Sequence, residues 1–469
     1  MHNQIQFILK IRPVSIVKLP SSLTVSPLLC LCILVLWINR LLSFFAFPQM
    51  VTSPDSYDFF AGQRFDFSNV SLLGHALRPW PSALLYSSLG LTFSALVQLI
   101  FSGIASTILV LELHSLLKNR TVRSIVLIGL VTALASADFV SWDLLANIQS
   151  LANTSIIMFI AFSLKYSRKP RSRDFSLLMC MGILCSIQRP TLILVVLPTL
   201  IYLLIRAQQV RKYAMCGIVC LIFLGVAVIP AYNQNKYWPG TYSGVAVLGH
   251  LKATSPITQE FRSFLKTEAV PECILKSDTR SVWPDGEYFC ESGQIWAREK
   301  SVGSFLAFLS GNPNSALRLA SFSLFGVSTN SASHYASAVS ILPPFLDSFL
   351  IGTRDPKTTT VGELDGSSKY YLYTPLILLA TIYLSLRLAH RKKRIDLFHD
   401  YKINLHLIDL LIVTNLITLT CSSIFIYAEW TRILEPNSLV FILSLIVGCG
   451  LILDSQLSSN HKRGVEESD

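Results

Sequence analysis

"SPLLCLCILVLWINRLLSFFAF" (residues 26–47) contains a single charged residue, Arg40, within an otherwise apolar or weakly polar run. A run of about 20 apolar residues is long enough to cross a bilayer as a helix, which satisfies its own backbone hydrogen bonds in hydrocarbon. Lys10, Arg12 and Lys18 precede the run, and no small-residue cleavage site follows it. We therefore expect an uncleaved first membrane helix.

Further apolar runs follow in a chain of 469 residues, of which 52% are hydrophobic and 14% charged, with a mean hydropathy of +0.52. This composition is typical of an integral membrane protein and unlike that of a soluble protein with one anchor. The sequence therefore predicts an all-α polytopic membrane protein with about ten transmembrane helices. Their approximate ranges are 26–47, 91–112, 123–140, 147–164, 174–188, 191–206, 214–231, 371–389, 406–427 and 437–454.

The basic residues predict the orientation of these helices. The net charge of +11 could suggest nucleic acid as a partner. However, the lysines and arginines cluster in alternate connections between apolar runs, which is the positive-inside pattern, so we expect no nucleic acid partner. The basic connections are assigned to the cytoplasm, and they contain Lys118, Arg120, Arg123, Lys165, Arg168, Lys169, Arg171, Arg173, Arg206, Arg211, Lys212, Arg387, Arg391, Lys392, Lys393, Arg394, Lys462 and Arg463. The opposite short connections contain only Arg64, Arg78, Arg189 and Arg432.

This topology divides the chain into cytoplasmic, membrane and extracytoplasmic parts. The loop 48–82 lies on the outer side, and we expect amphipathic helices in it. A membrane domain of about seven spans precedes the outer segment 232–370, and a domain of about three spans follows it. The predicted parts are the cytoplasmic N-terminus 1–25, the membrane domain 26–231, the extracytoplasmic domain 232–370, the membrane domain 371–454 and the cytoplasmic tail 455–469.

The segment 232–370 is too long for a structureless connection, so we expect it to fold. Cys273 and Cys290 lie here in a polar context, whereas the other eight of the ten cysteines lie in apolar runs. In an oxidising compartment a bridge between them would close a loop of about 18 residues and contribute around 3 kcal/mol. The stretch "SVGSFLAFLSGNPNSALRLASFSLF" (301–325) predicts two short amphipathic helices, broken at Asn312 and Pro313.

Acidic residues begin the first outer loop, in "SPDSYDFFAGQRFDFSNVSLLGHALRPWP" (53–81). Asp55 and Asp58 are three residues apart and share a face if the segment is helical. Ser53 and Pro54 form a plausible helix start, so Asp55 has an alternative role near the positive end of a helix dipole. Capping does not require Asp58.

Cationic residues gather at the same predicted membrane face. His75 and Arg78 precede "PWPSALLY", Arg189 lies in "IQRPT", and Glu429 and Arg432 lie in "YAEWTRILEP". Arginine binds phosphate bidentately, so these positions suit a lipid-linked phosphate. The alternatives are an interfacial anchor for Arg78 and helix-joining arginine–carboxylate pairs for the others.

A third outer connection contains Asp138, Trp142 and Asp143. Short acidic loops are common, and Asp143 is also placed to cap the next helix. We therefore do not assign these residues to catalysis from the sequence.

The order of these features resembles the GT-C superfamily of polyprenyl-phosphate-sugar glycosyltransferases, which includes dolichyl-phosphate-mannose mannosyltransferases. Arg40 matches an arginine late in the first span, and "PDSYDF" matches a PDSxxY-like acidic motif. "RPWP" is similar to an RPPGYP-like motif before the next helix, and Arg189–Pro190 and Arg432 match later arginine positions. The acidic residue that the family carries at the start of the fourth span is replaced by Gln149.

The resemblance implies a membrane enzyme that moves a sugar from a polyprenyl-phosphate-linked donor to a hydroxyl of an extracytoplasmic glycan, lipid or protein. Asp55 would be the general base, with Asp58 assisting it or binding a metal, and Arg432 would contact phosphate. Arg78 and Arg189 would face phosphate or acceptor. The expected location is the extracytoplasmic face of a bacterial plasma membrane, or the endoplasmic reticulum membrane in a eukaryote. No cofactor is assigned, and a divalent metal is left open, with Asp55 and Asp58 as its candidate ligands.

Two other functions remain as alternatives. An O-antigen polymerase or ligase would also use arginines on a lipid diphosphate, but it would not require the acidic pair. A lipid or sugar transporter is disfavoured because ionisable residues are scarce in the middle of the apolar runs.

Overall fold

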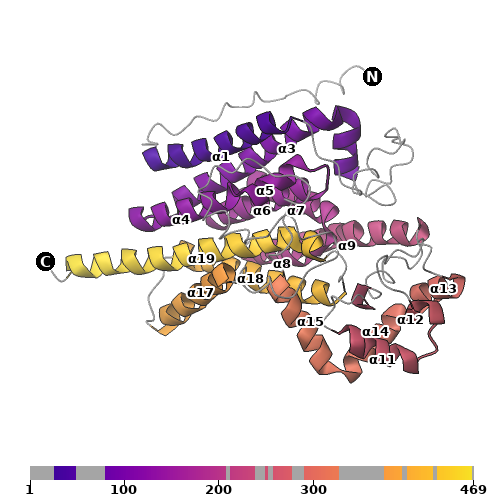
Figure 1. Cartoon of the computed structure of the whole chain (residues 1–469). Coiled ribbons are helices and arrows are strands. Elements are labelled where there is room, and N and C mark those ends of the chain that lie inside the picture. The colour runs from indigo at the N-terminus through magenta and orange to yellow at the C-terminus, as the bar shows by residue number, and fades with distance from the viewer. Residues whose placement is uncertain are drawn as a thin grey trace, which may run out of the picture.

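The computed structural model describes residues 26–48, 80–206, 212–237, 249–251, 257–276, 290–326, 374–392, 399–425 and 430–466. Within these ranges every regular element is a helix (Figure 1). In chain order they are α1 Pro27–Ala46, α3 Trp80–Leu116, α4 Arg120–Leu134, α5 Ala137–Ser141, η2 Trp142–Leu144, α6 Gln149–Arg168, α7 Ser172–Gln188, η3 Pro190–Leu192, α8 Ile193–Arg206, α9 Lys212–Tyr237, η4 Gly249–Leu251, α11 Thr258–Thr267, α12 Glu272–Lys276, α13 Glu291–Glu299, α14 Ser301–Gly311, α15 Pro313–Gly326, α17 Thr374–Lys392, α18 His399–Phe425 and α19 Trp430–Glu466.

Four of the described helices are long and apolar enough to cross a membrane, by length and composition. They comprise residues 27–46, 88–116, 402–421 and 439–458, and shorter apolar helices lie at 190–206, 214–228 and 378–390. Many large apolar side chains on these helices face outward, such as Leu31, Phe45, Leu221 and Leu384. In the part of the chain that the structure describes, the protein is therefore an all-α membrane protein.

One predicted span is shorter than expected, and the predicted break near residue 189 is present. The span predicted at 123–140 is interrupted, because α4 ends at Leu134 and Ser136 caps the short helix α5 by accepting a hydrogen bond from the Phe139 amide. The division near residue 189 is present, since α7 and α8 are separate helices. Arg189 has an extended backbone, as expected for a residue that precedes proline, and Pro190 begins the 3₁₀ turn η3.

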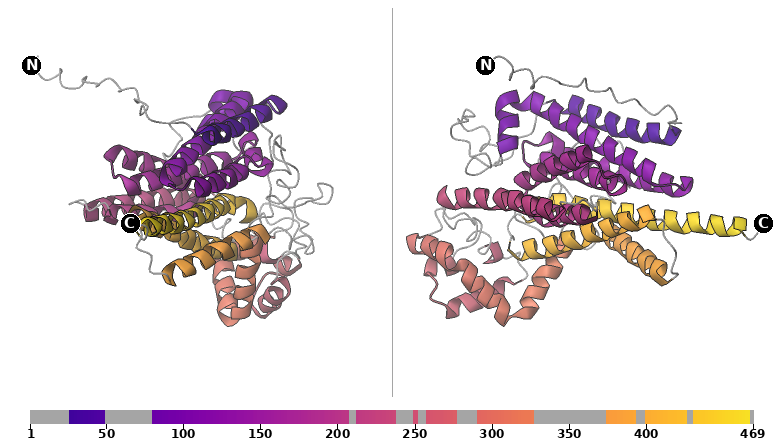
Figure 2. Two further views of the ribbon diagram at one scale, coloured as in Figure 1. Left: turned by 90° about the vertical axis from the view of Figure 1, so that its left-hand side faces the viewer. Right: turned by 180° about the vertical axis from the view of Figure 1, so that it is seen from behind.

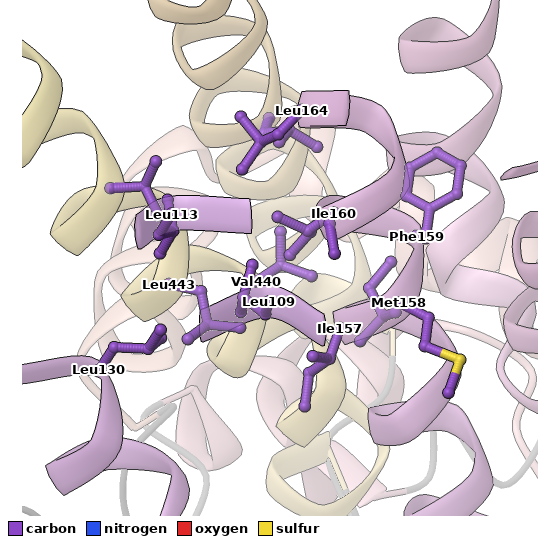
Figure 3. Packing of buried hydrophobic residues seen from close by; sticks show 14 of the residues in the cluster. Leu109, Leu113, Leu130, Ile157, Met158, Phe159, Ile160, Leu164, Val440 and Leu443 are labelled. Carbon is purple, nitrogen blue, oxygen red and sulfur yellow. The ribbon is translucent and has the colours of Figure 1, made fainter. Parts of the chain in front are cut away.

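Helix α6 lies at the centre of the bundle, packed against α3, α7, α18 and α19. Figure 3 shows this core, in which side chains of α6 meet those of α3, α4 and α19. The close approach of α19 to α4 requires Gly450, because a Cβ there would lie 2.5 Å from Cγ2 of Val126. The labelled residues of Figure 3 are Leu109, Leu113, Leu130, Ile157, Met158, Phe159, Ile160, Leu164, Val440 and Leu443.

Helices α11 to α14 form a second group with its own apolar cluster, at the lower right of Figure 1 and the lower left of the reverse view in Figure 2. Phe261 packs edge-on against Phe305 with ring centroids 5.3 Å apart, and His250 stacks on Phe305 at 4.7 Å. Cys273 and Cys290 are joined by a disulfide. The predicted pair of helices is present as α14 and α15, and α15 runs back to contact α18.

Candidate functional site

Arg40 of α1 is buried inside the bundle, with 2% of its surface exposed. Its guanidinium donates hydrogen bonds to Ser102 Oγ at 2.9 and 3.2 Å and to Ser106 Oγ at 3.0 Å, both on α3. It also donates to the Leu36 carbonyl at 3.0 Å and lies 5.9 Å from the centroid of the Phe139 ring. A buried guanidinium needs a counter-charge as well as neutral acceptors, because charge is expensive to desolvate.

Asp143 in η2 supplies that counter-charge. The residue is fully buried and interacts electrostatically with Arg40. Its Oδ1 accepts a hydrogen bond from Ser150 Oγ at 2.7 Å, and Ser102 also bonds to the carboxyl. Burial raises the pKa of Asp143 to about 6, against the opposing effects of Arg40 and the two serines. A carboxyl with a pKa near neutrality is able both to hold and to release a proton under working conditions.

A kink in α3 brings a second set of polar side chains next to Asp143. Gly90 has a φ of 69°, a left-handed conformation that glycine adopts without strain, and the helix bends there. Tyr86 lies before the kink and Gln98 after it, and Gln98 Nε2 donates to Tyr86 Oη at 2.6 Å. The Tyr86 hydroxyl in turn donates to the carbonyl of Asn147. The kink therefore ties α3 to the connection that contains Asp143.

Several buried polar atoms in this region have no hydrogen-bond partner among the described residues. Three are donors, namely Trp142 Nε1, Asn147 Nδ2 and Gln188 Nε2, and two are acceptors, namely Asp143 Oδ2 and Gln98 Oε1. Leaving one such group unpaired costs about 1–3 kcal/mol, so we expect buried water or a polar ligand to satisfy these groups. We call it the outer polar cluster and define it as Arg40, Ser82, Tyr86, Gln98, Ser102, Trp142, Asp143, Asn147, Ser150 and Gln188.

Arg189 follows the cluster directly in sequence. Its side chain is buried, with 8% exposed, and Gln188 beside it accepts a hydrogen bond from Ser82 Oγ at 2.8 Å. Thr191 donates to Asn437 Oδ1 on α19 at 3.1 Å, and Asn437 donates to Asn415 on α18 at 2.9 Å. These contacts tie the residues on either side of Arg189 to α3 and to α19.

Most of the site residues predicted from the sequence lie outside the part of the chain that the structure describes. Asp55, Asp58, His75, Arg78 and Glu429 lie outside the described residues. Arg432 lies in the first turn of α19, and its side chain is likewise outside what is described. Within the described ranges, no group of three or more His, Cys, Asp or Glu side chains is placed to hold a metal ion.

Sequence reasoning gave too little weight to Asp143 and did not single out Tyr86, Gln98 or Asn147. One signal could have identified Asp143, because an arginine within an apolar run requires a nearby carboxylate, and the third outer connection offers one. The uncharged residues carry no such signal. No protein-family model matches this sequence, and a search of curated proteins finds no relative of it.

Proposed function

We propose that the chain is a membrane glycosyltransferase of the GT-C type, which moves a sugar from a polyprenyl-phosphate-linked donor to a hydroxyl on an extracytoplasmic acceptor. The observation that carries the proposal is the buried Arg40–Asp143 pair, with its surrounding unpartnered donors and acceptors. In the GT-C resemblance a carboxylate is expected near the fourth span. Gln149 does not supply it, but Asp143 lies in the connection just before α6.

The proposed topology has about ten crossings, with the outer polar cluster at the extracytoplasmic end. Segments assigned to that end meet in the cluster: the start of α3, the connection before α6 and the end of α7. The loop 53–81 is continuous in sequence with the start of α3, so we propose that its acidic residues lie at the same end of the bundle. This convergence supports a common site for the loop and the cluster.

The proposed reaction uses the carboxylates and cations in separate roles. Asp55 accepts the proton of the acceptor hydroxyl, whose oxygen forms a bond to the anomeric carbon of the sugar. The bond between that carbon and the phosphate oxygen breaks, and the polyprenyl phosphate leaves. Arg432, Arg78 and Arg189 balance the charge of the leaving phosphate. Asp143, which accepts a hydrogen bond from Ser150 and is attracted by Arg40, orients the acceptor or donor sugar through its second oxygen.

A reconstituted transfer assay tests this proposal. The purified chain in liposomes is supplied with polyprenyl-phosphate mannose or glucose, and release of polyprenyl phosphate is measured with a panel of glycan acceptors. We expect Asp55→Asn to lower the rate at least about 100-fold, as is typical for loss of a general base. Asp143→Asn should lower it by up to about 100-fold, because the sugar is then less well oriented. Asp66→Asn, in the same loop but outside the motif, is the matched control and should retain activity.

Two results would reject the enzyme. One is labelling of residues 53–81 from the cytoplasmic side, which would separate them from the outer face. The other is sugar uptake into vesicles without cleavage of the phosphate bond, which would indicate a transporter. Full activity of Asp55→Asn would instead favour a polymerase or ligase that relies on arginines.

A further inference from the structure

A group of basic side chains lies at the opposite end of the bundle from the outer polar cluster, where α8 ends and α18 begins. We call it the basic cluster and define it as Arg206, Arg387, Lys402 and His406. Arg206, Arg387 and Lys402 come from three different helices, and all three act electrostatically on His406. Arg206 also lies against Tyr202, with its guanidinium carbon 5.8 Å from the ring centroid, and Tyr202 reaches the Ile403 carbonyl at 3.4 Å.

Among the residues that the structure describes, the cations of this cluster outnumber its acidic partners. Asp409 is already engaged, since its Oδ2 lies 2.7 Å from Arg387 Nη2 and its Oδ1 accepts a hydrogen bond from Tyr383. Arg206 and Lys402 have no acidic partner among the residues that the structure describes. Arg387 Nε is buried without a hydrogen-bond partner in the same set. Within the described part of the chain, the cluster therefore has both spare positive charge and a spare donor.

Apolar side chains flank these cations on the outward-facing surface. Ile205 beside Arg206 is 45% exposed, and Leu384 and Leu388, which flank Arg387 on α17, are 59% and 60% exposed. Lys402 is the first residue of an apolar stretch long enough to cross a membrane, which places it near the level of lipid headgroups. A free anion would contact only the cations. A phospholipid would contact both the cations and the apolar side chains, with its phosphate on the basic cluster and its acyl chains along the exposed leucines.

We propose that the basic cluster binds the headgroup phosphate of an anionic phospholipid from the adjacent leaflet, with the acyl chains lying along α8 and α17. The positive-inside assignment makes this the cytoplasmic leaflet. The lipid joins α8 to the consecutive helices α17 and α18, which lie far from α8 in sequence, so it acts as a tie across the three helices. This site is independent of the proposed transferase reaction, which takes place at the other end of the bundle.

The test is lipid binding to the full chain, purified in an uncharged detergent. Thermal unfolding is followed by intrinsic fluorescence while phosphatidylglycerol, phosphatidylcholine or inorganic phosphate is titrated in. We expect phosphatidylglycerol to raise the unfolding temperature in a saturable way, whereas phosphatidylcholine and inorganic phosphate do not. In the double variant Arg206→Gln/Lys402→Gln the half-saturating phosphatidylglycerol concentration should rise about 30-fold, or about fivefold for each cation removed.

Two further variants separate this site from a general effect of charge. Arg120→Gln/Arg173→Gln removes the same charge from exposed positions assigned to the same face and should bind phosphatidylglycerol like the wild type. Arg206→Lys/Lys402→Arg keeps the charge and should also retain binding. The proposal is overturned if the double glutamine variant binds as tightly as the control, or if phosphatidylcholine stabilises the wild type equally. It is also overturned if inorganic phosphate alone gives the full stabilisation, because the site would then hold a free anion.

Discussion

Two of the regions of this helix bundle that contain charged groups satisfy them differently. In one region, which we call the inner ion-pair group, Arg168 bonds to Glu112, and Lys165 lies 3.1 Å from Asp174. The carboxylate of Asp454 accepts hydrogen bonds from the Lys118 and Asn119 amides at 2.9 and 2.5 Å, just before α4. In the outer polar cluster, Arg40 and Asp143 attract each other electrostatically and share Ser102 as a hydrogen-bond partner. Around them lie donors and acceptors that have no partner among the described residues.

Polar groups of the first kind are paired with other helices and hold the bundle together. Polar groups of the second kind have unused hydrogen-bonding atoms that a ligand or water would satisfy. The carboxylates of the inner ion-pair group all have partners, and Arg168 and Glu112 keep 21% and 16% of their side chains exposed. Water is therefore able to compensate for part of any lost contact. Arg40 and Asp143 are buried away from water, so loss of their interaction should lower the free energy of unfolding by a larger amount. Four predictions test or refine this contrast.

The largest effect is expected from Arg40→Gln. Removing the guanidinium leaves Asp143 buried without its cation, which should lower the free energy of unfolding by about 3–5 kcal/mol. Denaturant titration in micelles measures the change. The double variant Arg40→Gln/Asp143→Asn should recover part of the loss. A double variant as unstable as the sum of the two single variants would mean that the residues are not coupled.

The next effect concerns pH and Asp143. Burial raises the pKa of this carboxyl from 3.8 to about 6 in the folded chain, so the fold favours the protonated form. The wild type should therefore be most stable relative to Asp143→Asn below about pH 4. This advantage should decline by up to about 3 kcal/mol as the pH rises to about 6, and it should then stay constant. If the advantage instead grew with pH, the attraction of Arg40 would outweigh burial.

A smaller effect is expected in the inner ion-pair group. Arg168→Gln should lower the free energy of unfolding by about 1–2 kcal/mol, because water reaches the Glu112 carboxylate that loses its partner. Arg171→Gln, on an exposed side chain three residues away, is the matched control and should change stability by less than about 0.5 kcal/mol. A loss as large as that of Arg40→Gln would remove the distinction between the two regions.

The smallest effect is expected at Glu260 and Arg318, which pair at 2.6 Å between α11 and α15 with 41% and 50% of their side chains exposed. The hydrogen bond from Arg318 lowers the pKa of Glu260, so the pair stabilises the fold above the ordinary glutamate pKa. That contribution is lost as the pH falls through the lowered value, and screening keeps it under about 1 kcal/mol. Hydrogen exchange of α11 amides in wild type and Glu260→Gln should differ slightly at pH 6, and the difference should shrink as the pH is lowered. A difference that does not shrink at acidic pH would argue against the ion pair.

The helices themselves were predictable from the sequence, because apolar composition over about 15 residues or more is a strong local signal. Helices α7 and α8, the break at Arg189 and Pro190, and the pair α14 and α15 were all expected from such signals. The early end of α4 was not, since it depends on Ser136 accepting a hydrogen bond from an amide three residues ahead. That contact occurs within a run that still looks apolar.

The candidate site was predictable only in part. Arg40 and Arg189 stood out as charges in apolar surroundings, but Asp143 looked like one of many acids in short loops. Its importance depends on burial and on α1 lying beside α3, and neither is encoded in nearby residues. The link between Tyr86 and Asn147 also depends on the kink at Gly90, because a straight α3 would carry Tyr86 away from Gln98.

The disulfide between Cys273 and Cys290 has a consequence for the order of biosynthesis. Its two cysteines are 17 positions apart, and both precede α17, α18 and α19 in the chain. If the proposed orientation holds, the bridge is able to close on the far side of the membrane while these last helices are still being translated. The loop would then be covalently locked before α18 exists to receive α15, so docking would be a late step of assembly rather than the event that shapes the loop.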